Sequence, residues 1–113
     1  MDVRLSKLRE ALSSRDRRLV LRVFRRRPND WLAQADVCSI ARLPLGQVLG
    51  VIRGSPGRYN PDLSLLTLGL IEEKEVQVSA KRSRKLYKLN GKNQLALDLI
   101  DHILKWHQVE EEP

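Results

Sequence analysis

The sequence has little cysteine and few aromatic residues, and each shortage restricts what the chain can be. Cys38 is the only cysteine in 113 residues, so no disulfide can form within the chain. This usage is typical of a reducing compartment, and we expect a cytoplasmic protein. Aromatic residues make up 4% of the chain and hydrophobic residues 42%. The core must therefore be built mainly from Leu, Val, Ile and Ala.

Long apolar runs are also missing. No stretch approaches the roughly 20 apolar residues that a membrane-spanning helix needs. The charged N-terminus lacks the apolar segment of about 7–15 residues that defines a secretory signal. We therefore expect a protein without a membrane partner.

Residue patterns of catalytic and metal sites are not found. His102 and His107 lie five positions apart and would point in different directions around a helix. Cys38 falls on the apolar face of a predicted helix. We also find no Ser-His-Asp arrangement, no glycine-rich phosphate loop and no carboxylate pair that would share one pocket. The sequence therefore predicts neither an enzyme nor a bound cofactor or metal.

Basic residues, in contrast, are abundant and unevenly distributed. Lys and Arg number 21 against 14 Asp and Glu, which gives a formal charge of +7. Residues 1–30 hold ten basic and four acidic side chains, and residues 81–92 hold six basic and no acidic ones. Acidic residues gather instead at 72–75 and in a tail at 110–113. Such a field attracts polyanions, either nucleic acid or an anionic membrane surface.

Hydrophobic periodicity predicts a single domain over residues 1–113, mainly α with one small β-hairpin, in the α+β class. Ser13 or Ser14 is expected to cap the second helix and Asn90 the last one. A short turn joins the third and fourth helices, which is the geometry of a helix-turn-helix. The expected elements are helices at 2–12, 15–27, 34–41 and 45–53, a helical turn at 61–68, a hairpin containing Val76, Val78, Tyr87 and Leu89, and a final helix at 92–109.

Five arginines mark one side of the predicted helix at 15–27, opposite a stripe of apolar residues. A helix face with this much positive charge repels itself unless a polyanion or an acidic partner offsets the charge. We expect these arginines either to contact phosphate or to lie in solvent or against acidic residues of a partner subunit. The apolar stripe is Leu19, Val20, Val23 and Phe24, and the arginines are Arg15, Arg18, Arg22, Arg25 and Arg26.

The last helix has a broader apolar face than one small domain is expected to cover. This breadth predicts a homodimer in which the helix packs against its symmetry mate. The alternative is that the face covers only its own domain. The expected interface residues are Leu97, Ile100, Ile103, Leu104 and Trp106.

Three segments together resemble the winged helix-turn-helix regulators of prokaryotes, with the MarR and PadR groups as the nearest analogues. They are the helix-turn-helix from Ala35 to Ile52, the segment Leu68-Gly69-Leu70-Ile71-Glu72 that leads into the wing, and Tyr87-Lys88-Leu89 that returns from it. The similarity covers roughly residues 15–107, with a winged-helix core at 15–89. It implies a dimeric transcription regulator that binds double-stranded DNA, with the helix-turn-helix in the major groove and the basic wing on the minor groove or phosphates.

The resemblance also implies two groups of DNA-contacting residues. Gln and Arg side chains can pair with adenine and guanine in the major groove, and arginine suits a narrow, electronegative minor groove. The second helix offers few such groups, so we expect weak sequence discrimination from it, or specificity supplied by DNA shape. The predicted contacts are Gln47, Arg53, Arg58 and Tyr59 around the second helix, and Lys81, Arg82, Arg84 and Lys85 on the wing.

Residues 54–67 are additional to the winged-helix pattern, so the DNA-reading helix is either 45–53 or 61–68. Segment 61–68 has only three polar side chains that could reach base edges, Asp62, Ser64 and Thr67. Residues 45–53 are therefore favoured as the DNA-reading helix. Two other functions stay open: an architectural protein of the nucleoid that coats DNA with little sequence preference, and a winged-helix adaptor for another protein. RNA binding is disfavoured, because recognition of single strands uses exposed aromatic residues and this chain has few.

Overall fold

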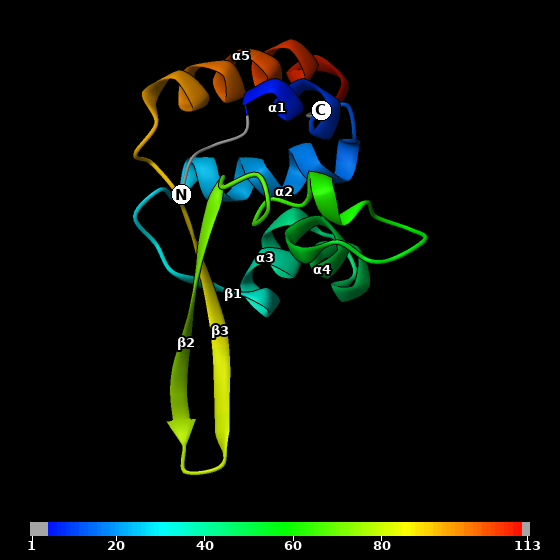
Figure 1. Ribbon diagram of the computed structural model, residues 1–113. Helices are drawn as coiled ribbons and strands as arrows, with labels where there is room; N and C mark the ends of the chain where they lie inside the picture. The colour runs from blue at the N-terminus through cyan, green and yellow to red at the C-terminus, as the bar shows by residue number, and fades with distance from the viewer. Residues whose placement is uncertain (1–4, 112–113) are drawn as a thin grey trace.

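The structure is a computed structural model that describes residues 5–111, with side chains as far as His107. The mainly helical α+β class predicted from the sequence is confirmed (Figure 1). Residues 2–4 of the first predicted helix and 112–113 of the predicted tail lie outside the described residues. The elements are α1 (Leu5–Ala11), α2 (Arg15–Arg26), β1 (Leu32–Ala33), α3 (Gln34–Ala41), α4 (Leu45–Arg53), the 3-10 turn η1 (Pro61–Leu63), β2 (Ile71–Ser79), β3 (Arg82–Leu89) and α5 (Gln94–Glu111).

Helix α2 lies between two helical layers. Figure 1 shows α1 and α5 on one side of it and α3 and α4 on the other. The apolar stripe of α2 therefore packs on the helix-turn-helix, where Val20, Leu21 and Phe24 are fully buried. Leu19, which the periodicity placed in that stripe, is only half-buried. Because α2 is covered on two sides, Arg18 and Arg22 are buried, whereas Arg15 and Arg26 at its ends are exposed.

Two arginines of α2 do not lie where the sequence indicated. Arg18 and Arg22 are 6% and 7% exposed. Arg18 donates to the carbonyl oxygens of Leu12 and Ser13 at 3.0 and 2.9 Å, and Arg22 donates to the carbonyl oxygen of Leu104 at 2.9 Å. For Arg18 and Arg22 the prediction of contact with phosphate, solvent or a partner subunit is wrong, because the turn after α1 and helix α5 supply carbonyl acceptors on this side of α2. Arg15 and Arg26 are exposed, and for them the prediction is not contradicted.

Two further arginines of α2, Arg25 and Arg17, are also involved in the packing of the chain. Arg25 donates from Nε and Nη2 to the two carboxylate oxygens of Asp101 at 2.7 and 2.9 Å, which joins α2 to α5. This hydrogen bond raises the pKa of Arg25. Arg17 is 7% exposed, and burial lowers the pKa of its guanidinium. At least four of the six arginines between residues 15 and 26 are therefore buried or bonded within the chain.

The ends of α2 and α5 are capped by different means. Ser14 is the N-cap of α2, as predicted, and its side chain accepts a hydrogen bond from the backbone N–H of Arg17. The prediction for α5 is wrong by three positions, because Asn93 accepts from the N–H of Ala96 at 3.0 Å. Asn90 instead donates to the carbonyl oxygen of Gly69 at 2.8 Å, which fixes the exit of β3 beside the entry to β2.

Residues 61–68 do not form a second candidate reading helix. Only Pro61–Leu63 is helical, as one 3-10 turn. Leu63, Leu65 and Leu68 are buried, and the N–H of Leu65 donates to the carbonyl oxygen of Val51 at 3.0 Å. The segment packs against the end of α4, so α4 is the exposed second helix of the helix-turn-helix.

The apolar face of α5 mainly covers the chain's own core. Leu97, Ile100 and Leu104 are at most 8% exposed and belong to the single hydrophobic core, and Ile103 is half-buried against it. Of the five predicted interface residues, only Trp106 is largely exposed, at 76%. An interface built on the other four would have to open the core, so the homodimer stays a prediction without support from burial.

No described helix by itself is long and apolar enough to cross a bilayer. Helices α3 and α4 together pass a test of length and composition, but a bend of 112° separates them.

Candidate nucleic-acid interface

The three strands form an antiparallel sheet in the order β1-β3-β2. Leu32 of β1 pairs with Tyr87 of β3, so the returning strand of the hairpin is bonded to the residue pair that precedes α3. The periodicity did not predict β1, because a strand of two residues has no repeat to detect. This pairing fixes the hairpin beside the helix-turn-helix.

The hairpin is longer than the sequence indicated. Arg82 and Arg84 were expected in a loop but lie in β3, paired with Ser79 and Val76 of β2, and only Ala80 and Lys81 connect the strands. Figure 1 shows this hairpin extending away from the helices, and the molecule measures 45 × 30 × 29 Å along its principal axes. The cations are therefore carried on a paired ribbon.

The half of the hairpin nearest the helices is packed and electrically balanced. Ile71, Tyr87 and Leu89 are buried. On the opposite face, the Lys74 ammonium lies 4.3 Å from the centroid of the Trp31 ring, within the range of a cation–π interaction. Lys85 lies 3.7 Å from Glu73 across the strands. This half anchors the ribbon to the domain.

The outer half of the hairpin, residues 76–84, carries three cations and no acidic residue. Lys81, Arg82 and Arg84 are exposed, and within the part of the chain that the structure describes they form no ion pair. Lys85, the next residue along the chain, is half-buried. The outer half makes no contribution to the core that would explain its charge.

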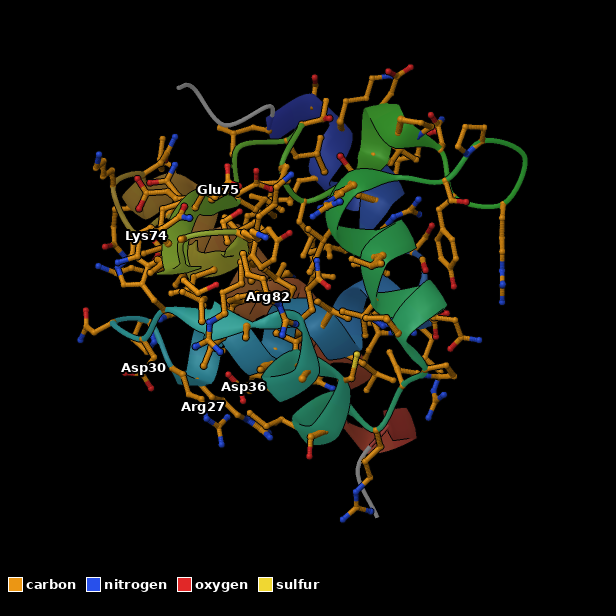
Figure 2. The ribbon with its side chains drawn as sticks, turned by 90° about the horizontal axis from the view of Figure 1, so that it is seen from below. Arg27, Asp30, Asp36, Lys74, Glu75 and Arg82 are labelled. Atoms are coloured by element: carbon orange, nitrogen blue, oxygen red, sulfur yellow. The ribbon has the colours of Figure 1, made fainter. Side chains whose placement is uncertain are left out.

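A groove of about 500 Å³ separates the hairpin from the start of α3. Its cationic residues, Arg84 and Lys85, face Gln34 and Ala35 of α3 across it, and Glu75 on the hairpin accepts a hydrogen bond from Ser83. Figure 2 looks at the face from which the hairpin projects and labels Arg82 between the hairpin and α3 in that view. Asp36, labelled in the same figure, accepts from the N–H of Ala33 at 3.0 Å, so its carboxylate has a structural partner.

Arg53, the last residue of α4, is bonded to the base of the hairpin. Its Nη2 donates to the hydroxyl oxygen of Tyr87 at 2.8 Å, and Gln34 Nε2 lies 3.5 Å from the same oxygen. Tyr87 is completely buried. One phenol therefore joins α3, α4 and the base of the hairpin and orients a cation there. Gln47, also predicted as a DNA contact, is half-buried on α4.

Arg58 and Tyr59 are not brought to this surface. The Tyr59 hydroxyl donates to Asp16 at 2.6 Å, and its ring covers Gly50, where an added Cβ would lie 2.3 Å from the ring. The Arg58 guanidinium lies 5.7 Å from the ring centroid. In both Figure 1 and Figure 2 the loop that carries them lies on the other side of α4 from the hairpin. The sequence predicted one cluster, and the structure separates these two residues from it.

Tyr59→Phe tests this anchoring. We expect a loss of about 1 kcal/mol in the free energy of unfolding at neutral pH, since the hydrogen bond to Asp16 is removed.

Burial, and then that hydrogen bond, raise the pKa of Tyr59. A raised tyrosine pKa contributes stability that is full below about pH 10 and is lost as the pH rises through the folded-state value. Urea unfolding at neutral and alkaline pH should show this alkaline loss in the wild type and less of it in the variant. An unchanged midpoint at neutral pH would contradict the anchoring role, and Arg58→Met serves as the control that keeps the hydroxyl.

The helix-turn-helix has an exposed apolar surface that was not predicted from the sequence. Leu45, the first residue of α4, is 51% exposed, and Ile40 of α3 is 39% exposed. A cleft of about 530 Å³ lies between the two helices. The available signal was the position of Leu45 directly after Pro44, on the first turn of the second helix. The cleft is lined by Gln34, Ala35, Cys38, Ser39 and Leu45.

The histidines lie far from this surface. His102 and His107 line a separate cleft of about 450 Å³ between α1 and α5. Figure 1 shows these two helices at the other end of the molecule from the hairpin. In the described part of the chain, no group of three or more His, Cys, Asp and Glu side chains is arranged to hold a metal ion.

The order α2, β1, α3, α4, β2, β3, with β1 paired to the returning hairpin strand, defines a winged helix-turn-helix protein. The chain belongs to the EarA-like family, whose model matches residues 8–98, from α1 into the first turns of α5. Comparison with curated proteins and with solved structures found no match. The resemblance to the MarR and PadR groups stays a prediction.

Proposed function

We propose that this protein binds double-stranded DNA, with the outer half of the hairpin on phosphates or in the minor groove and the helix-turn-helix at the major groove. The observation that carries the proposal is the charge of residues 76–84, where Lys81, Arg82 and Arg84 are exposed, no acidic residue occurs, and none of the three cations forms an ion pair among the described residues. Binding a polyanion offsets the repulsion between these cations, and arginine is favoured in a narrow, electronegative groove. We further propose that the protein acts as a non-enzymatic transcription regulator on the nucleoid in the cytoplasm, as a homodimer.

The arrangement of the two surfaces supports duplex DNA over other polyanions. The groove lies between the hairpin and the start of α3, and Arg53 of α4 is bonded to Tyr87 at the base of the hairpin. A ribbon and a helix placed side by side can occupy adjacent grooves of one duplex. Single-stranded nucleic acid would instead call for aromatic stacking surfaces, and no aromatic residue occurs between residues 76 and 85.

Fluorescence anisotropy with a labelled random-sequence duplex at several salt concentrations tests the proposal. We expect log K to fall linearly with log salt, with a slope of about −0.9 for each phosphate neutralised. Single-stranded RNA of the same length should bind more weakly. Failure to bind the duplex at low salt would contradict DNA binding and favour the alternative of a protein adaptor.

A second candidate, an architectural DNA-coating protein, is favoured by the composition of α4. Its exposed or half-buried residues are Leu45, Gly46, Gln47, Leu49 and Arg53, so only two of the five carry a polar side chain. Few hydrogen-bonding groups for base edges imply little sequence discrimination by that route. Competition between genomic fragments and random duplex separates the two, since a regulator prefers particular fragments and a coating protein binds all alike.

Tyr87→Phe tests the role of the Arg53 junction in DNA binding. The variant keeps the packing of the ring but removes the acceptor of Arg53, so we expect affinity for all duplexes to fall severalfold while Arg53→Ala lowers it further. If Tyr87 acts through Arg53, Tyr87→Phe has no effect in the Arg53→Ala background. Anisotropy on the four proteins gives this cycle, and equal losses in both backgrounds would contradict the positioning role.

A further inference from the structure

The exposed side of the helix-turn-helix is apolar where DNA-reading proteins usually present polar groups. Leu45 is 51% exposed, Leu49 is half-buried on the same side one turn later, and Ala35 of α3 is exposed beside them. At Gly46 an added Cβ would meet nothing within 4 Å. We call these four residues the apolar strip. Exposed leucine at the first position of the second helix has no role in the core of the domain.

Basic residues border the apolar strip at both ends. Arg53 follows Leu49 by one helical turn at the end of α4, and the exposed Arg42 lies in the turn before Leu45. The cleft that contains Leu45 and the groove that contains Arg84 and Lys85 are both lined by Gln34 and Ala35, so the two depressions adjoin. An apolar strip bordered by cations matches the major groove, where base edges are flanked by phosphates.

The major groove contains one apolar group, the C5-methyl of thymine. Residues at the N-terminal end of the second helix of a helix-turn-helix approach base edges most closely. Leu45 occupies that position, and Gly46 next to it has no side chain to hold the helix away from the bases. We infer that the apolar strip reads thymine through its methyl group, with Leu45 as the principal contact. The inference rests on the proposed binding of DNA.

Substitution of thymine by deoxyuridine tests the inference, because it removes the methyl group and keeps every hydrogen-bonding group of the base pair. The probes are a short A·T duplex and the same duplex with each thymine replaced by deoxyuridine. The second pair of probes is a G·C duplex with and without 5-methylcytosine. The 5-methylcytosine places a methyl group at the same position in the groove. We expect the methylated member of each pair to bind more tightly, by about fourfold for each methyl group buried.

Matched variants connect this preference to the strip. Leu45→Ala should bring the ratio of affinities for the thymine and deoxyuridine duplexes close to one. Leu95→Ala removes a leucine that is 70% exposed on α5 and should leave the ratio unchanged. Alanine at Arg82 and Arg84 should weaken binding to both duplexes and preserve the ratio, since phosphate contacts do not sense the methyl group.

The outcomes separate the inference from the proposed function. Equal affinity of the wild type for thymine and deoxyuridine duplexes, with binding intact, overturns the inference and leaves DNA binding in place. Leu45→Ala that weakens both duplexes by the same factor also overturns it, because Leu45 would then contact something other than the methyl group. If the wild type binds none of the four duplexes, both proposals fail.

Discussion

Alanine at both Arg82 and Arg84 is expected to lower the affinity for duplex DNA about a hundredfold at low salt, whatever the sequence. The two guanidiniums lie on β3 in the outer half of the hairpin and have no ion pair among the described residues, so their charge is available to phosphates. A charged hydrogen bond contributes roughly 1.5 kcal/mol, or about tenfold, for each arginine. The slope of log K against log salt should become less steep by about 1.8, corresponding to two phosphates.

The control for this pair removes the same charge elsewhere. Arg9 and Lys105 are exposed on α1 and α5, at the other end of the molecule from the hairpin tip (Figure 1). Alanine at both positions lowers the net charge equally, and we expect only a small, salt-screened loss of affinity. Comparable losses from the two double variants would mean that net charge, and not the hairpin, governs binding. Unchanged affinity of the Arg82 and Arg84 variant would refute the role of the wing.

Glutamate at Leu97 or Leu104 is expected to unfold the protein. Both side chains are at most 8% exposed in the hydrophobic core, and a carboxylate placed there has no partner. An unpaired buried charge costs about 3–5 kcal/mol, a large part of the roughly 5–15 kcal/mol that stabilises a domain of this size. Thermal unfolding followed by circular dichroism should show a strongly lowered Tm or no cooperative transition. A folded variant with the wild-type Tm would show that α5 is not part of the core.

Trp106→Glu is the companion variant, because this side chain is 76% exposed. It should fold with a Tm close to that of the wild type. If the wild type is a dimer through this end of α5, sedimentation should show the variant as a monomer. A dimer unaffected by this change would place the contact between copies elsewhere, since the other predicted interface residues are wholly or partly buried within one chain.

The periodic elements were predictable from the sequence because their signals are local. Helices α3 and α4 begin and end where the apolar spacing and the Leu43–Gly46 turn indicated, and Ser14 caps α2 as expected. Lys81, Arg82, Arg84 and Lys85 were identified as a cluster because they are neighbours in the chain. Such features depend on adjacent residues, and tertiary contacts modify them little.

Errors occurred where a side chain's partner is distant in the sequence. Arg22 was assigned to an open face because its acceptor is the carbonyl of Leu104, 82 positions away. Tyr59 was grouped with the DNA contacts, whereas its hydroxyl is bonded to Asp16 of α2. A sequence reveals that a helix has a basic side and an apolar side, but not which other element will cover each one.

The amino-acid order alone determined that this chain would be an α+β domain with a helix-turn-helix, a hairpin and an acid-free basic segment, because propensity, apolar period and charge are properties of neighbouring residues. Tertiary packing decided which charged side chains remain exposed and available to a ligand. Helix α5 and the turn after α1 accept hydrogen bonds from two arginines of α2, while Arg82 and Arg84 of the hairpin form no ion pair among the described residues. A buried guanidinium must find its hydrogen-bond acceptors within the protein, and an exposed one keeps its donors for a ligand.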